Sequence, residues 1–371
     1  MSAFAVVTGG GTSGHVLPAL AVADALVAAG HPPEQIHYLG CTRGIETELL
    51  PATPYPHHFF DVVGFQRELN LRSVRIDAGF APKLWRARGR AIRLLRALQP
   101  RVVVSVGGYA SMPAVLAARK LKIPVVVVSY DLLPGKASRV AARRAAACAV
   151  AFPDSPLPHA ELTGAPVRQA ILAVDRATGR AAARAALGLP DDRFVVAVMG
   201  GSLGSGPLNA AVNELLDRHA GDTGLAVRHA VGRRFLDAAR APIDGSHGVL
   251  YQPIGYEPDM PSVYAAADLL IGRGGASTVH EVAATGTPAI LVPWAGAAEN
   301  HQVANVAWLA DAGAAVLLPE AELGRLVELV AELRSDPARL ADLSANAYRM
   351  GEVHRSGRLA ALVERVATPA E

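Results

Sequence analysis

The sequence predicts an α/β protein built from two Rossmann-like, doubly wound domains that face a central cleft. Short Val-rich runs alternate with Ala-, Leu- and Arg-rich stretches of helical period, which is typical of parallel sheets covered by helices. The chain has 371 residues, more than one ordinary core accommodates. Each half also opens in the same way, with a Val-rich run, a glycine turn (TGGGTSG, then MGGSLGSG) and an apolar helix.

In the first half, Val- and Ala-rich runs predict strands at residues 3–8, 35–39, 101–106, 125–129 and 147–151, and helical periodicity predicts helices at 18–29, 83–98, 112–120 and 135–146. In the second half the same criteria predict strands at 194–199, 226–230, 249–252, 269–271, 289–292 and 315–318, and helices at 208–219, 260–266, 277–285, 299–312, 320–335 and 337–348. The break between the halves is expected between residues 152 and 189, where FPDSPLPHAELTGAPVR is rich in proline and turn residues. The domains are accordingly expected at 1–163 and 164–350, followed by a C-terminal segment at 351–371.

Composition excludes several classes of protein. Cys41 and Cys148 lie far apart and form no metal-binding or redox spacing. No run of 18 uncharged apolar residues is present, so no membrane-spanning helix is expected. The glycines at 9–14 interrupt the apolar start and no basic segment precedes it, so no signal peptide is expected.

The first glycine turn has the spacing of a dinucleotide-binding turn. Gly9, Gly11 and Gly14 follow an apolar run and precede an amphipathic one. A dinucleotide site also needs an acidic residue at the end of the second strand, and Cys41, Thr42 and Arg43 stand there instead. A nicotinamide or flavin enzyme is therefore disfavoured. A P-loop is excluded, since neither turn ends in Gly-Lys-Ser/Thr.

The same turn remains suited to a polar or anionic ligand. Its glycines allow close approach of the backbone, and amides at a helix start favour negative charge. Thr12, Ser13 and His15 would stand at this edge, facing the cleft. A capping or half-buried role for His15 is the alternative.

The second half carries a denser group of candidates between residues 271 and 313. Ala276, Ser277 and Thr278 begin a helix whose free amides suit a diphosphate. Glu281 can accept hydrogen bonds from ribose hydroxyls, or it can pair with Thr278 in a capping box. His301, Gln302 and Asn305 suit sugar hydroxyls, with helix capping and surface positions as the alternative for the last two.

Five motifs follow one another along the chain: GGGTSGHVLPALAVADAL, SVGGYASMPAVLAA, GAPVR, GGSLGS and GGASTVHEVAATGTPAILVPWAGAAENHQVAN. Together they resemble the MurG family of GT-B glycosyltransferases over nearly the whole chain. The resemblance implies an inverting, UDP-N-acetylglucosamine-dependent hexosyltransferase of peptidoglycan synthesis, and hence a role in cell wall biogenesis, cell shape, cell division and the cell cycle. The acceptor it implies is the C4 hydroxyl of undecaprenyl-pyrophosphoryl MurNAc-pentapeptide. It also implies an acceptor- and membrane-side first domain, a UDP-sugar-binding second domain and a C-terminal helix that packs back on the first.

The resemblance also implies roles for matching residues. His15 becomes the candidate base. Donor contacts are expected at Thr12, Ser13, Gly14, Arg168, Ser202, Glu257 (through its backbone, at the uracil), Ala276, Ser277, Thr278, Val279, His280, Glu281 and Gln302. The acceptor side is expected at Gly107, Gly108 and Tyr109. No Asp-x-Asp pair stands at a strand end, so no metal or other cofactor is expected.

The chain departs from the family pattern at one loop in particular. The family commonly has His-Glu-Gln-Asn where this chain has Val128–Asp131, and Ser138, Ala165 and Leu203 also replace usual residues. Asp131 is a second candidate base or hydroxyl ligand, or else it caps the next helix. The loop also motivates an alternative function, transfer to another glycolipid or natural product. A non-catalytic UDP-sugar-binding module that keeps the donor fold is a further alternative.

A basic stretch between residues 71 and 101 suggests contact with an anionic membrane surface. The stretch contains one acidic residue, Asp77, and nine basic residues: Arg72, Arg75, Lys83, Arg86, Arg88, Arg90, Arg93, Arg96 and Arg101. Apolar residues are interleaved with them, as in helices that lie on membranes. The location expected is peripheral, on the cytoplasmic face of the cell membrane; an ordinary solvated helix is the alternative. Nucleic acid is disfavoured because no aromatic platform accompanies the arginines.

Overall fold

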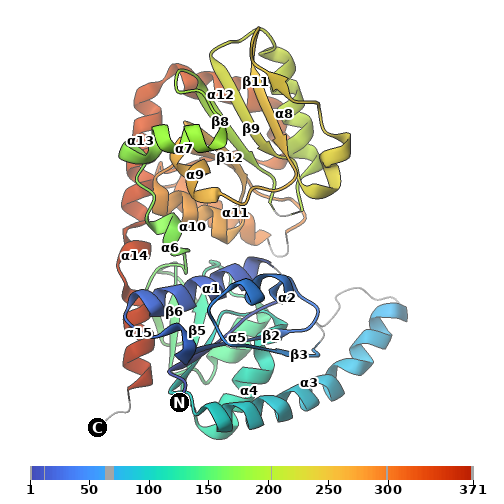
Figure 1. The fold of residues 1–371 in the computed structure, drawn as a ribbon, viewed down its shortest axis with the longest axis vertical. Helices are drawn as coiled ribbons and strands as arrows, with labels where there is room; N and C mark the ends of the chain where they lie inside the picture. Colours follow the sequence, from blue (N-terminus) through green and yellow to red (C-terminus); the bar gives the residue numbers. More distant parts are fainter. Residues whose placement is uncertain (1, 12, 63–70, 202, 298–299, 369–371) are drawn as a thin grey trace. The chain divides into compact units, whose positions relative to one another are not determined.

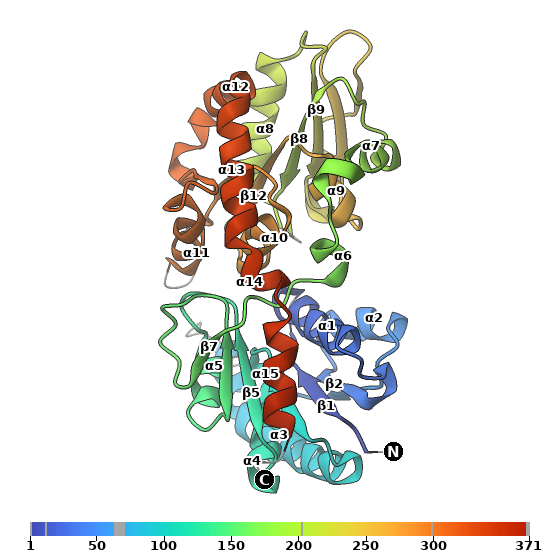
Figure 2. The ribbon, with the colours of Figure 1, turned by 90° about the vertical axis from the view of Figure 1, so that its left-hand side faces the viewer.

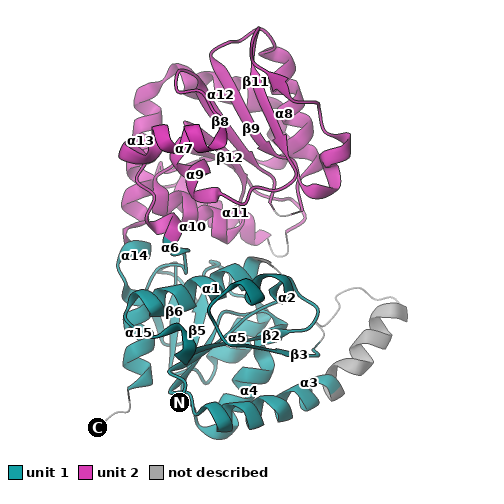
Figure 3. Cartoon of the chain, in the orientation of Figure 1, with its two compact units in different colours: residues 1–169, 353–371 teal, residues 170–352 magenta. Residues whose placement is uncertain are grey.

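The computed structural model describes residues 2–11, 13–62, 71–201, 203–297 and 300–368, with residues 13 and 71–82 described by their backbone alone. Two compact units are present (Figures 1 and 3). Unit 1 contains residues 1–169 and 353–371, and unit 2 contains residues 170–352. The chain therefore leaves unit 1 at Gln169 and returns to it at Val353, whereas the sequence placed these boundaries after residues 163 and 350.

Unit 1 is built on a parallel seven-stranded sheet in the order β3-β2-β1-β4-β5-β6-β7. The strands are β1 (Ala5–Thr8), β2 (Ile36–Cys41), β3 (His57–Phe60), β4 (Val102–Ser105), β5 (Val125–Ser129), β6 (Ala147–Val150) and β7 (Ala160–Leu162). The Val-rich strands β1, β4 and β5 are buried along their whole length, as expected of parallel strands covered on both faces.

Helices cover both faces of this sheet (Figure 2). They are α1 (Ser13–Ala28), α2 (Glu46–Leu49), α3 (Leu71–Leu98), α4 (Met112–Leu121), α5 (Lys136–Ala142) and α15 (Arg358–Ala367). One face packs against α3, α4 and α5 through alanines and valines. On the other, α15 contacts α1 and strands β4, β5 and β6, and His31 forms an ion pair with Glu364 at 2.9 Å. The C-terminal helix is thus part of unit 1.

Unit 2 repeats the design with the strand order β10-β11-β9-β8-β12-β13-β14. Its strands are β8 (Phe194–Met199), β9 (Leu225–Ala230), β10 (Ile243–Asp244), β11 (Leu250–Ile254), β12 (Leu269–Arg273), β13 (Ala289–Val292) and β14 (Val316–Leu317), parallel except for β10. Its helices are α7 (Arg176–Leu187), α8 (Gly206–Arg218), α9 (Met260–Ala266), α10 (Ala276–Thr285), α11 (His301–Ala310), α12 (Leu326–Ser335) and α13 (Pro337–Met350). Two short helices, α6 (Gln169–Leu172) and α14 (Glu352–Arg355), lie at the crossings between units.

Strand order fixes where each unit binds ligands. In doubly wound sheets ligands bind beyond the carboxyl ends of the strands where the order reverses. That point lies between β1 and β4 in unit 1, and between β8 and β12 in unit 2. Each of these four strands is followed by a glycine turn: TGGGTSG after β1, GGY after β4, GGSLGS after β8 and GGAST after β12. Each unit therefore presents its glycine turns at its own switch point.

Three strands and the helices α2, α6 and α7 were not expected from the sequence. Strands β3, β7 and β10 are short and polar or partly exposed, so they lack the apolar run that marks the others. The segment interpreted as a connection at 152–189 contains β7, which completes the first sheet, and α7, which packs on α9. Within α7, Arg184 is buried and bonds Asp268 at 2.7 Å. An ion pair with a distant residue therefore explains why an arginine of this segment, which the sequence suggested was a linker, is buried.

Candidate active site

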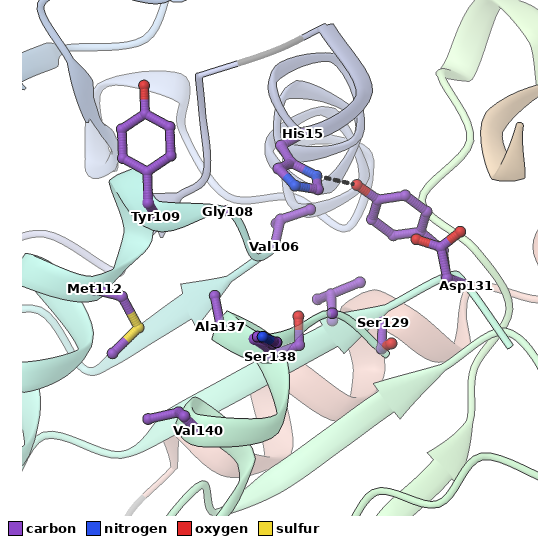
Figure 4. A pocket seen from close by; sticks show the side chains of 14 residues that line it. His15, Val106, Gly108, Tyr109, Met112, Ser129, Asp131, Ala137, Ser138 and Val140 are labelled. Atoms are coloured by element: carbon purple, nitrogen blue, oxygen red, sulfur yellow. Dashed lines mark hydrogen bonds between the residues drawn. The ribbon is translucent and has the colours of Figure 1, made fainter. Parts of the chain in front are cut away.

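A cavity of about 460 Å³ opens at the switch point of unit 1 (Figure 4). Three segments form it: the start of α1, the turn between β4 and α4, and the loop between β5 and α5. Its lining is mostly apolar, with Val106, Met112, Val128 and Val140 among its residues. His15, Tyr109, Asp131, Lys136 and Ser138 supply polar groups. The structure therefore brings together the two candidate bases, His15 and Asp131, and the acceptor-side residue Tyr109.

His15 lies in the first turn of α1, not at its cap. The helix begins at Ser13, five residues before the start expected from the sequence, and continues through Pro18. The imidazole Nδ1 lies 2.9 Å from the Tyr130 hydroxyl and 3.2 Å from the Gly14 carbonyl oxygen. Burial lowers the pKa of His15 below its usual value, against the opposing influence of Asp131, the Gly14 carbonyl and Glu46. The ring is consequently neutral near pH 7, as a general base must be.

Glycines at positions 11 and 108 allow the turn after β1 and the turn after β4 to pack closely against each other. A Cβ atom on Gly108, where φ is +75°, would stand 2.6 Å from His15 Cδ2 and 2.7 Å from the Gly10 carbonyl oxygen. A Cβ atom on Gly11, where φ is +93°, would stand 2.7 Å from the Tyr109 ring. The GGY turn after β4 is thus packed directly against the turn after β1, which explains why both are rich in glycine.

Glu46 is a site residue that was not predicted from the sequence. It begins α2, has no exposed surface, and its carboxyl oxygens accept hydrogen bonds from the Gly11 amide (3.1 and 3.2 Å) and from the Cys41 amide and thiol (both 3.0 Å). A Cβ atom on Gly10 or Gly44 would clash with it, at 2.3 and 1.8 Å. An internal acid therefore takes the Gly11 amide that a phosphate would need. The signal was present in the sequence as an acid three residues beyond Arg43.

Asp131 lines the cavity and does not cap the following helix. The N-cap of α5 is Gly135, which has no side-chain cap, so the capping alternative for Asp131 is wrong. The negative charge of Asp131 raises the pKa of His15 and so acts against the effect of burial. In the same loop, Ser138 is buried, and a Cβ atom on Gly107 would stand 3.0 Å from its hydroxyl.

In unit 2 the start of α10 offers uncapped amides. Its N-cap is Gly275, with no side-chain cap and open space where a Cβ atom would be. The Val279 amide bonds the Gly275 carbonyl at 3.1 Å, so the amides of Ala276, Ser277 and Thr278 precede the first intrahelical bond. Thr278 lies inside the helix, which rules out the capping-box alternative for Glu281.

Two side chains expected at the donor are turned into the core. Val279 and His280 are buried, and the His280 ring packs 5.6 Å from that of Trp308, centroid to centroid. Helical periodicity places them on the inner face of α10. Both side chains therefore take part in the packing of unit 2. On the same helix Glu281 is partly exposed and accepts a hydrogen bond of 2.8 Å from the Tyr264 hydroxyl.

The remaining donor candidates are distributed over both units. Gln302 lies at the start of α11, where its side-chain oxygen accepts a 2.9 Å bond from the Trp294 amide. Glu257 is buried and accepts a 2.6 Å bond from Arg228, which leaves its backbone for a ligand. Arg168 belongs to unit 1. Burial raises the pKa of Asp24, and the hydrogen bond from Tyr55 and the charge of Arg168 offset part of this increase. Thr12, Ser202 and the side chain of Ser13 lie outside the described residues.

The described residues lack two features. They contain no cluster of three or more His, Cys, Asp or Glu side chains arranged to hold a metal ion. They also contain no helix long and apolar enough to cross a membrane.

Sequence families match both halves of the chain. The glycosyltransferase family 28 N-terminal domain matches residues 5–150, and the glycosyltransferase family 28 C-terminal domain matches residues 195–358. A relative from Mycobacterium bovis (strain BCG / Pasteur 1173P2), named UDP-N-acetylglucosamine--N-acetylmuramyl-(pentapeptide) pyrophosphoryl-undecaprenol N-acetylglucosamine transferase, is 40% identical over 98% of this chain and 89% of its own length. A relative of the same name from Nocardioides sp. (strain ATCC BAA-499 / JS614) is 40% identical, with 96% of each chain covered.

Solved structures agree with this assignment. The crystal structure of Acinetobacter baumannii MurG is similar with a TM-score of 0.72 and 27% identity, covering 98% of this chain and all of that one. A glycosyltransferase of kitacinnamycin is similar with a TM-score of 0.65 and 18% identity, covering 99% of both chains, a likeness that concerns the fold alone. The two-domain GT-B fold is confirmed.

Proposed function

The chain belongs to glycosyltransferase family 28 and, within it, to the MurG family, and from that premise we propose that it transfers N-acetylglucosamine from UDP-N-acetylglucosamine to the C4 hydroxyl of undecaprenyl-pyrophosphoryl MurNAc-pentapeptide. This is the step from lipid I to lipid II in peptidoglycan synthesis. The observation that carries the proposal is the His15 imidazole, which is hydrogen-bonded to Tyr130 at the edge of a cavity at the switch point of unit 1.

Unit 2 supplies the donor site in this proposal. The amides of Ala276, Ser277 and Thr278 bind the diphosphate at the start of α10, where the helix dipole favours negative charge. The Glu281 carboxylate accepts hydrogen bonds from the ribose hydroxyls, oriented by the Tyr264 hydroxyl. The side-chain amide nitrogen of Gln302 is directed to the sugar, because its oxygen accepts the Trp294 amide. Departing UDP is stabilised by these fixed amides, which require no metal ion.

Unit 1 supplies the base and the acceptor site. The C4 hydroxyl of the acceptor loses its proton to His15 as its oxygen attacks the anomeric carbon of the donor. Attack from the face opposite UDP breaks the bond to the diphosphate oxygen and inverts the anomeric centre. The proton resides on the imidazole and the electron pair on UDP.

An acceptor assay tests the proposal. Purified protein is mixed with radiolabelled UDP-N-acetylglucosamine and the muramyl lipid in detergent or vesicles, and labelled lipid is quantified with and without EDTA. We expect transfer at the same rate in both conditions. Loss of transfer in EDTA would contradict the metal-independent mechanism.

The altered loop at Val128–Asp131 supports a second candidate, a transferase with a different acceptor. The loop lines the cavity with Val128, Ser129, Tyr130 and Asp131, where the family commonly has His-Glu-Gln-Asn. Labelling of another glycolipid or a natural product, without labelling of the muramyl lipid, would favour this candidate. Binding of UDP-N-acetylglucosamine with no turnover on any acceptor would favour a non-catalytic binding module.

We also propose that α3 binds the anionic cytoplasmic face of the cell membrane. On the described part of its surface, Arg86, Arg90 and Arg93 are exposed. Trp85 is 66% exposed and lies under the Arg88 guanidinium, 4.8 Å from it. An exposed tryptophan among arginines is suited to the headgroup region of a bilayer.

Vesicle binding tests the role of α3. Each arginine near an anionic surface contributes ~1 kcal/mol, so replacing Arg86, Arg90 and Arg93 by alanine is expected to weaken binding to phosphatidylglycerol vesicles by about 100-fold. Exposed arginines of unit 2 provide the matched control, with the triple change Arg218→Ala, Arg325→Ala and Arg349→Ala. Equal loss of binding in both variants would contradict a specific role for α3.

A further inference from the structure

We propose that Tyr130 is a positioning residue that fixes the His15 imidazole as its Nδ1–H tautomer, which leaves the lone pair on Nε2 to accept the proton of the acceptor hydroxyl. This inference rests on the proposed function, because a base is needed only where a hydroxyl is deprotonated. It assigns a role to a side chain that replaces the usual residue of the family's loop.

The hydrogen bonds around Gly14 determine the tautomer. The Tyr130 hydroxyl donates to the Gly14 carbonyl oxygen, which can only accept. A phenol has one proton, so the hydrogen between Tyr130 Oη and His15 Nδ1, 2.9 Å apart, must come from the imidazole. Nδ1 also lies 3.2 Å from the Gly14 oxygen, where again only the imidazole can donate. Both contacts are satisfied by one arrangement, with the proton on Nδ1.

Pro18 explains why the Gly14 carbonyl is available to these two donors. In a regular helix this carbonyl would accept the amide of residue 18, four positions later. Pro18 lies inside α1 and has no amide hydrogen. The missing helical bond is replaced by the bonds from the Tyr130 hydroxyl and the His15 ring. The proline inside the helix therefore makes the arrangement possible.

The surroundings hold the ring in this orientation. The Cδ2 edge of His15 packs on Gly108, and the ring lines the cavity while Nδ1 makes both of its described hydrogen bonds (Figure 4). Burial raises the pKa of Tyr130 and lowers that of His15, so both groups are neutral near pH 7. The other titratable groups around the ring are Tyr109, Asp131 and Lys136 in the lining, and Glu46 behind the turn.

A spectroscopic experiment tests the tautomer directly. The full-length protein is labelled with ¹⁵N-histidine, and the resonances of His15 are assigned by comparison with His15→Gln. We expect the wild-type ring to show a protonated, pyrrole-type Nδ1 and an unprotonated, pyridine-type Nε2 at pH 7.5. In Tyr130→Phe, which keeps the aromatic ring and loses the hydroxyl, we expect shifts averaged between the two tautomers.

Tyr38→Phe is the matched control. Its hydroxyl donates a 2.7 Å bond to the Gly9 carbonyl of the same turn and has no bond to His15. Removing this hydroxyl takes away one hydrogen bond to the same turn and is expected to leave the tautomer of His15 unchanged. A change of tautomer in both variants would reduce Tyr130 to a structural role and overturn the proposal.

Kinetics provide the second measurement. Because a base held in the wrong tautomer cannot accept the proton, we expect Tyr130→Phe to lower kcat by about tenfold or more, with the KM of both substrates within about twofold of wild type. An Nε2–H tautomer in the wild type, or an unchanged tautomer in Tyr130→Phe, would overturn the inference. Absence of any transferase activity in the wild type would contradict the proposed function alone, since the tautomer is measured without turnover.

Discussion

The two units share one architecture but use their glycine turns in opposite ways. In unit 1 the turn after β1 binds Glu46, whose carboxyl oxygens accept hydrogen bonds from the Gly11 amide. In unit 2 the turn after β12 leads into α10 through Gly275, and no side chain caps that end. The first arrangement excludes a phosphate from the Gly11 amide, and the second leaves amides for one.

This difference shows that a glycine pattern does not specify its ligand. Both turns provide a flexible backbone at a helix start, which favours negative charge in either case. What differs is the source of that charge: a side chain of the protein in unit 1, and in our proposal the donor diphosphate in unit 2. The first turn, despite its dinucleotide spacing, therefore packs against Glu46 and supports His15, and its Gly11 amide does not bind a phosphate.

The largest effect is expected from removing the base. His15→Ala should lower kcat by about 10²–10⁴-fold, the usual contribution of a general base. The Kd for UDP should be unchanged, because the α10 amides and Glu281, which bind UDP in our proposal, belong to unit 2. Steady-state kinetics and calorimetric titration with UDP measure the two quantities. His247→Ala, an exposed histidine of unit 2, is the control and should change neither. A weakened Kd with unchanged kcat would reverse the roles assigned to the units.

Removing the internal acid should destabilise unit 1. Glu46→Ala leaves the buried amides of Gly11 and Cys41 without an acceptor, which costs about 2–5 kcal/mol of unfolding free energy. Denaturant titration measures the loss. Glu48→Ala, an exposed acid two residues further along α2, should change stability by less than about 0.5 kcal/mol. Equal stability of the two variants would mean that Glu46 does not hold the turn.

Removing the donor carboxylate should weaken UDP binding moderately. Glu281→Ala loses hydrogen bonds from ribose hydroxyls to a charged group, so the Kd for UDP should rise by about 10–100-fold. Binding of uridine and of uracil measured in parallel locates the loss, because uracil lacks the ribose. Glu214→Ala, an exposed acid on α8, is the control. An equal Kd in the two variants would exclude Glu281 from the donor site.

The smallest effect is a shift in pH dependence. Burial lowers the pKa of His15 below 6.5, the usual value for histidine. The base is therefore protonated only at more acidic pH, and kcat/KM should fall there. Because the charge of Asp131 raises this pKa, Asp131→Asn should move the acid limb to still lower pH. Profiles of kcat/KM between pH 5 and 8 show both shifts. A limb above pH 6.5, or a shift upward in Asp131→Asn, would contradict the assignment.

Local sequence patterns determined the two doubly wound units, the glycine turns at the strand ends and the position of His15. Strands and amphipathic helices leave periods of two or 3.6 residues in the chain, and turns require glycine. The same patterns predicted the start of α10 within one residue, because its glycines and small residues stand next to each other in the sequence.

Tertiary structure alone decided how those residues are used. Glu46 meets Gly11 across 35 residues, and Tyr130 meets His15 across 115. The His280 ring packs against Trp308, 28 positions later, and Arg184 of α7 pairs with Asp268, 84 positions later. Such contacts leave no periodic signal, since a buried polar group needs only one partner and the fold can bring that partner from anywhere along the chain.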